Sequence, residues 1–120
     1  MKQGIILFAH GSRDPLWRGP IESVAARIKI RSPNSLVGCA YLELSEPDLP
    51  TFATQLIARG AHHLCILPMF LGVGKHARED LPVLIDALRL AHPGVRIEVK
   101  ASIGEEARLL DLLADIALDA

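Results

Sequence analysis

The sequence predicts an α/β fold, in which a single doubly wound domain over residues 1–120 has a four-stranded parallel sheet with helices on both faces. Three observations predict it. Continuously apolar runs, typical of strands covered on both faces, alternate with stretches of helical period. The strand candidates start about 30 residues apart, which is the length of a β-α unit. The length of 120 residues suits one hydrophobic core.

Four strands and four helices follow from these patterns in chain order. The strand candidates are residues 5–9, 36–42, 64–67 and 95–99. Each is followed by a stretch in which apolar residues recur at i, i+3, i+4 and i+7, as in an amphipathic helix. These four stripes are Ile21, Val24, Ala25 and Ile28; Leu49, Phe52, Ala53, Leu56 and Ile57; Leu81, Leu84, Ile85 and Leu88; and Leu109, Leu112, Leu113 and Ile116.

Capping and breaking residues predict the helix limits. Asp48 is placed to cap the second helix, and Gly60 to end it. Pro82 lacks an N–H and is tolerated only in the first turn of a helix. We therefore expect the third helix to begin near Glu79 or Asp80.

The strand order brings three polar side chains to one edge of the sheet. Right-handed crossovers favour the flavodoxin-like order 2-1-3-4, which reverses between strands one and three. His10 follows strand one, His76 lies in the loop after strand three, and Glu43 follows strand two. Because the carboxyl ends of parallel strands share one edge, we expect two imidazoles and a carboxylate to converge there.

These residue types indicate metal chemistry. Neutral imidazole binds divalent Co, Ni, Fe and Zn, and a carboxylate serves as a third ligand or as a proton acceptor. Simpler interpretations stay open: His10 as a loop histidine, His76 as a solvated residue at a helix start, and Glu43 as part of a capping cluster with Asp48.

Composition and motifs argue against other classes of function. With 13 Lys+Arg and 14 Asp+Glu, the net charge of −1 gives no basic excess for nucleic acid or an anionic membrane. The sequence Gly72-Val73-Gly74 lacks the third glycine of a dinucleotide fingerprint, and Lys75 is not followed by Ser or Thr as in a P-loop. An FMN or phosphate module remains possible on fold grounds, although an aromatic content of 4% provides few residues for stacking on a flavin.

The compartment follows from targeting signals and cysteines. The N-terminal apolar stretch is too short for a signal peptide, and no apolar run approaches the roughly 18 residues of a membrane helix. Cys39 and Cys65 lie in apolar strand-like runs, as small buried hydrophobic residues do in a reducing compartment. We expect a cytoplasmic protein.

Three segments resemble the small, CbiX-type sirohydrochlorin chelatases: residues 6–15 with HGSRDP, residues 41–47, and residues 67–82 with a GxHxxxDxP element. This resemblance covers nearly the whole chain. It implies a class II chelatase that inserts a divalent metal into a tetrapyrrole without ATP, cobalt in cobalamin biosynthesis or iron in siroheme biosynthesis. His10 and His76 match the metal-binding histidines, and Glu43 matches an acidic site residue. The implied metal, Co²⁺, Fe²⁺ or Ni²⁺, is a substrate, and no permanently bound cofactor is implied.

The same loops offer a surface for an acidic ring. Cationic side chains are placed to meet its carboxylates, and apolar ones to lie under it. A non-catalytic Co or Ni carrier would use the same histidines without needing this surface. Because larger chelatases resemble two such domains in tandem, we expect a homodimer in which a second copy supplies the other wall of the cleft. The residues expected to bind substrate are Arg13, Lys75 and Arg78 together with Leu44, Phe70, Leu71 and Val73.

Overall fold

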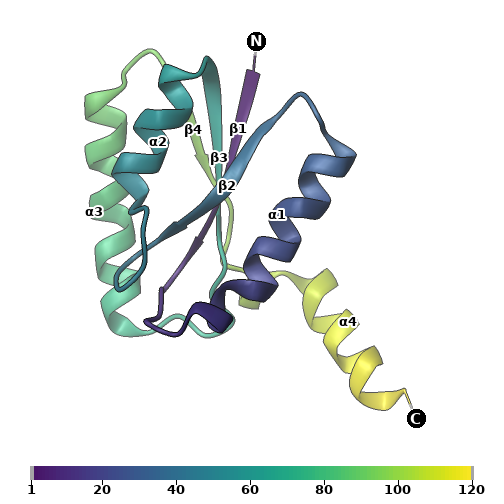
Figure 1. Cartoon of the computed structure of the whole chain (residues 1–120). Coiled ribbons are helices and arrows are strands. Elements are labelled where there is room, and N and C mark those ends of the chain that lie inside the picture. Colours follow the sequence, from purple (N-terminus) through teal and green to yellow (C-terminus); the bar gives the residue numbers. More distant parts are fainter. Residues whose placement is uncertain (1, 120) are drawn as a thin grey trace.

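The computed structural model describes residues 2–119 and confirms the predicted sheet. Its four strands are all parallel and lie in the order β2-β1-β3-β4 (Figure 1). Leu7 of the central strand β1 lies opposite Cys39 of β2 on one side and opposite Leu67 of β3 on the other. The strands are β1 (Lys2–Ala9), β2 (Leu36–Tyr41), β3 (Ala61–Pro68) and β4 (Arg96–Val99).

Successive residues of the central strands point to opposite faces of the sheet and pack into two apolar layers. Ile6 and Phe8 of β1 point into a core covered by α2 (Leu49–Ala58) and α3 (Lys75–Ala91). Leu7 lies on the other face, beneath α1 (Gly19–Arg31). This arrangement explains why the strands are apolar at successive positions, since each face of the sheet packs against helices.

The third helix begins earlier than its proline predicted. We expected a start near Glu79 or Asp80, but α3 begins at Lys75 and contains Pro82 in its interior, so that prediction is wrong. Pro82 is exposed, and so is Arg78, whose carbonyl loses its i+4 backbone donor to the proline. The cost of an interior proline, about 3 kcal/mol, is offset by the buried residues of the helix, which include Ile85.

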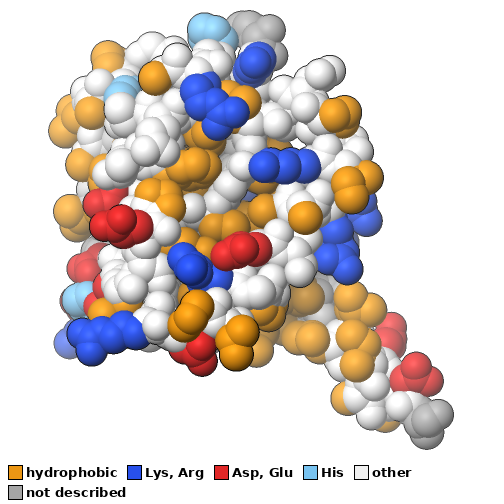
Figure 2. Space-filling view, viewed as in Figure 1, with side chains coloured by type: hydrophobic (Ala, Val, Ile, Leu, Met, Phe, Trp, Pro, Cys, Tyr) orange, Lys and Arg blue, Asp and Glu red, His pale blue; other side chains and the backbone are white. Residues whose placement is uncertain are grey.

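The last helix leaves the body of the molecule. β4 is followed by the 3-10 helix η2 (Ile103–Glu105) and by α4 (Ala107–Leu118), which projects away from the sheet (Figure 1). Hydrophobic side chains gather along one side of α4 and acidic ones along the other (Figure 2). Within residues 2–119, no helix combines the length and the hydropathy that a membrane span requires.

Candidate functional site at the carboxyl edge of the sheet

His10 is held in place by an aromatic neighbour. It follows β1 directly, is half-buried, and its ring centroid lies 4.6 Å from that of Phe70 at an interplanar angle of 57°. Phe70 is only 2% exposed and meets Phe8 edge-to-face at 5.8 Å. The expectation that Phe70 offers its own surface to a ligand is therefore not met: its ring supports His10 instead.

A glycine allows the loops after β1 and β2 to touch. The Glu43 N–H donates to the His10 carbonyl at 2.9 Å, and the Leu42 N–H donates to the Ala9 carbonyl at 2.8 Å. Gly11 has a φ of 98°, and a Cβ built on it would lie 1.7 Å from the Glu43 carbonyl oxygen. No other residue type fits there. The backbone thus places Glu43 beside His10, as the strand order predicted.

Ser45 is a positioning residue that the motifs did not reveal. Its hydroxyl accepts from the Ser12 N–H at 3.1 Å and donates to the Ser12 carbonyl at 2.8 Å, which ties the same two loops together a second time. Asp48, by contrast, caps α2 by accepting from the Thr51 N–H at 2.8 Å. Hydrogen bonds from Thr51 hold the pKa of Asp48 below its ordinary value. Glu43 is not part of that cap.

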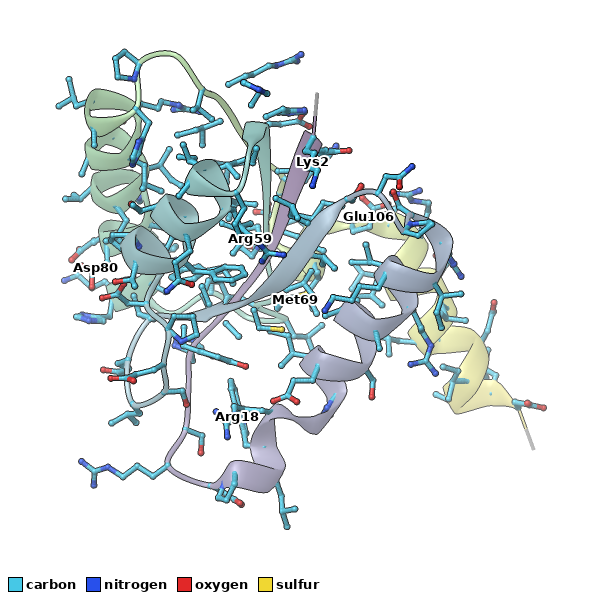
Figure 3. All side chains as sticks on the ribbon, turned by 45° about the horizontal axis from the view of Figure 1, so that its top comes forward. Lys2, Arg18, Arg59, Met69, Asp80 and Glu106 are labelled. Carbon is cyan, nitrogen blue, oxygen red and sulfur yellow. The ribbon has the colours of Figure 1, made fainter. Side chains whose placement is uncertain are left out.

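His76 occupies the first turn of α3 and pairs with a carboxylate. Its side chain is 74% exposed, and its Nε2 lies 2.9 Å from Oδ2 of Asp80. Asp80, labelled in Figure 3, lies one turn further along the same helix. Helical spacing would have indicated this i, i+4 pair, but the late start expected for the helix placed His76 outside it.

The three predicted reactive side chains share the carboxyl edge but do not converge on one point. The backbone joins His10 to Glu43, and His76 is paired with Asp80 instead. Among residues 2–119, no group of three or more His, Cys, Asp and Glu side chains is close enough to hold one metal ion.

The predicted ligand-binding loops are largely open to solvent. The three cations Arg13, Lys75 and Arg78 are all exposed. Leu44 is 54% exposed and Leu71 is 61% exposed, so both side chains are accessible to the face of a bound tetrapyrrole ring. Val73 is half-buried against the core instead. Two leucines and three cations thus form the accessible part of the predicted surface.

Burial raises the pKa of three other titratable groups on the strands of the sheet. Burial raises the pKa of Tyr41 to about 12. Burial also raises the pKa of the Cys39 and Cys65 thiols, which are free and half-buried. The groups that cause these shifts include none of the predicted site residues.

Comparisons with known proteins point to one family. A family model described as CbiX matches residues 4–120. The chain is 32% identical over 83 residues to a sirohydrochlorin cobaltochelatase from Methanococcus aeolicus. The aligned region covers 69% of this chain but only 58% of that relative. A solved CbiX protein from Marinobacter aquaeolei VT8 is 35% identical with a TM-score of 0.80, over 96% of this chain and 93% of that one. The sirohydrochlorin chelatase SirB from Bacillus subtilis subspecies spizizenii, solved in complex with cobalt, is 27% identical with a TM-score of 0.76, over 98% of this chain and 52% of that one.

Proposed function

The chain belongs to the CbiX family, and from that premise we propose that it inserts a divalent metal, Co²⁺ or Fe²⁺, into sirohydrochlorin without ATP. In this reaction the ion is a substrate, and the proposal includes no resident cofactor. The ion enters the ring as the two inner pyrrole N–H groups lose their protons. The protein must therefore hold the ion loosely, hold the ring, and accept protons.

The pairing of His76 with Asp80 is the observation that carries the proposal. Nε2 of His76 lies 2.9 Å from Oδ2 of Asp80, so this carboxylate can accept the Nε2–H and leave Nδ1 of a neutral ring as the donor to a metal. Metal-binding histidines typically donate their second N–H to a carboxylate in this way, which orients the ring and raises its basicity. His10, fixed by Phe70, is the second proposed ligand.

Glu43 is the proposed base. It is exposed, and its backbone is joined to that of His10, so a proton accepted from the ring can pass to solvent. The cations Arg13, Lys75 and Arg78 are proposed to bind the carboxylates of the substrate. A metal carrier would need neither these cations nor the exposed Leu44 and Leu71.

We also propose that the working form is a homodimer in the cytoplasm. One sheet edge offers a single wall to a ring as wide as a tetrapyrrole, and this chain spans about half of SirB. A second copy would supply the facing wall. The free thiols Cys39 and Cys65 suit a reducing compartment.

The decisive assay follows the absorbance change of sirohydrochlorin with Co²⁺, Fe²⁺ or Ni²⁺ against a control without protein. Wild-type protein accelerates insertion, and His10→Ala and His76→Ala abolish the acceleration with an unchanged circular dichroism spectrum. The matched control is His62→Ala, because His62 is an exposed histidine at the start of β3, at the opposite edge of the sheet.

Two outcomes would contradict the proposal. Wild-type rates in both site variants would remove the histidines from the mechanism. Stoichiometric metal binding by the wild type without faster insertion would make the protein a carrier.

A further inference from the structure

Two large apolar side chains that the proposed site does not use reach solvent beside it. Leu16 is 84% exposed and Trp17 is 40% exposed, and both belong to the 3-10 helix η1 (Pro15–Arg18). Because η1 follows the His10 loop directly, it lies at the carboxyl edge of the sheet, which is the lower edge in Figure 1. Neighbouring apolar side chains that stay exposed at such an edge indicate contact with a ligand.

Hydrogen bonds hold η1 in a fixed position. The Asp14 carboxylate accepts from the Leu16 N–H at 2.9 Å, and the Asp14 carbonyl accepts from the Trp17 N–H at 3.1 Å. The Ser12 hydroxyl accepts from the Asp14 N–H at 3.1 Å. Since Ser12 is also bonded to Ser45 of the loop after β2, η1 is tied to that loop as well as to its own. A ligand would meet a surface that is already formed, which reduces the entropy lost on binding.

Leu44, in the loop after β2, has a strained backbone that its own packing does not explain. Its φ of 63° lies in the left-handed region that a leucine seldom adopts. The Ser45 N–H donates to the Glu43 carbonyl at 2.8 Å, which closes a three-residue turn with Leu44 at its centre. The Leu44 side chain is exposed, so burial does not offset this strain. Strain of this kind is concentrated at binding and catalytic sites.

Packing fixes the indole of Trp17 relative to the strand that carries His10. The rings of Trp17 and Tyr41 have centroids 6.3 Å apart and an interplanar angle of 58°. Tyr41 is buried, and in the sheet it lies opposite Ala9, the residue before His10. With roughly 200 Å² for a whole tryptophan side chain, an exposed fraction of 40% leaves about 80 Å² free for a ligand.

We propose that Leu16, Trp17 and Leu44 form an apolar rim on which the tetrapyrrole lies, so that η1 is part of the substrate-binding surface. This inference rests on the proposed function. A conjugated ring presents flat, apolar faces, which suit an indole, and carboxylates at its periphery, which suit a guanidinium. Arg13 is exposed and directly precedes the Asp14 cap of η1, so one loop offers both kinds of contact.

The test measures the Kd of metal-free sirohydrochlorin by absorbance titration of the full chain, so it does not require metal insertion. The variants are Trp17→Ala, Trp17→Phe and Leu16→Ala. The matched control is Leu90→Ala, because Leu90 is also 84% exposed but lies near the end of α3, at the amino edge of the sheet. The insertion assay then gives kcat and the separate KM values for sirohydrochlorin and Co²⁺.

We expect Trp17→Ala to raise the Kd and the KM for sirohydrochlorin by about tenfold, because the ring would cover most of the roughly 80 Å² left on the indole. Leu16→Ala should raise both by a smaller factor, and Trp17→Phe should recover most of the affinity. The KM for Co²⁺ and kcat should change little, since the rim contacts the ring equally before and during insertion. A role in folding alone would instead lower Tm and leave the Kd of the folded protein unchanged.

The outcomes separate this inference from the proposed function. Wild-type Kd values in both Trp17→Ala and Leu16→Ala would overturn the inference, even in a protein that inserts metal. Wild-type protein that binds no sirohydrochlorin would overturn it as well. Binding that depends on Trp17, in a protein that does not accelerate insertion, would support the rim and refute the chelatase proposal.

Discussion

Replacing Gly11 by alanine should separate the two loops that hold His10 and Glu43. The added Cβ would lie 1.7 Å from the Glu43 carbonyl oxygen, and real Cβ contacts essentially never fall below 3.0 Å, so one loop must move by more than 1 Å. The φ of 98° adds about 1 to 2 kcal/mol of strain for a residue with a side chain. Loss of the bond from the Glu43 N–H to the His10 carbonyl adds about 1 kcal/mol.

Together these effects should destabilise the protein by about 2 to 3 kcal/mol, or lower Tm by about 10 °C for a domain of this size. A displacement of about 1 Å at reacting groups costs about 100-fold in rate. Thermal unfolding is measured at one protein concentration, alongside the insertion assay. The matched control is Gly94→Ala, because nothing lies within 4 Å of a Cβ at Gly94. If Gly11→Ala keeps the Tm and the rate of that control, the loop contact does not position the site.

Two further predictions concern the carboxylates of Asp80 and Asp48. Asp80→Asn should slow metal insertion by about 10- to 100-fold by removing the acceptor that orients His76, with little change in Tm because exposed ion pairs contribute about 0 to 1 kcal/mol. Asp48→Ala should cost about 1 kcal/mol in urea unfolding at neutral pH because α2 loses its cap. The pKa of Asp48 is lowered in the folded state, so its stabilisation is complete above the ordinary value of 3.8 and is lost as pH falls through the lowered folded value.

A control variant tests the role of Asp80, and the pH dependence of stability tests the role of Asp48. Glu79→Gln removes a neighbouring exposed carboxylate of α3 and should leave insertion unchanged, so equal losses in Glu79→Gln and Asp80→Asn would refute the role given to Asp80. The stability difference between wild type and Asp48→Ala should shrink in acid. A stability difference that does not change with pH would mean that the ionised carboxylate of Asp48 does not stabilise α2.

The sheet was predictable because its signals are local and repeated. The apolar runs and the crossover rule give the parallel order 2-1-3-4, which the structure confirms. The start of α3 was not predictable from Pro82 alone, because tolerance of an interior proline depends on which side of the helix meets solvent. The stripe of α4 predicted a helix, but periodicity cannot say which surface that helix covers.

The sequence predicted which loops form the candidate site, but it did not predict which of their side chains are buried or in contact. Strand order was enough to bring His10 and Glu43 to adjacent segments. The residues after β3 have no periodicity that separates inward from outward side chains, so buried Phe70 and exposed Leu71 looked alike in sequence. Ser45 acts through a partner 33 residues away, and nothing in its local sequence indicates that contact.

Phe70 has two contacts that link the C-terminal segment to the proposed site. Its ring packs on His10, and its carbonyl accepts from Gly104 at the root of α4. The residue that supports the proposed ligand His10 also anchors η2, so a change in the position of η2 reaches the site through a single residue.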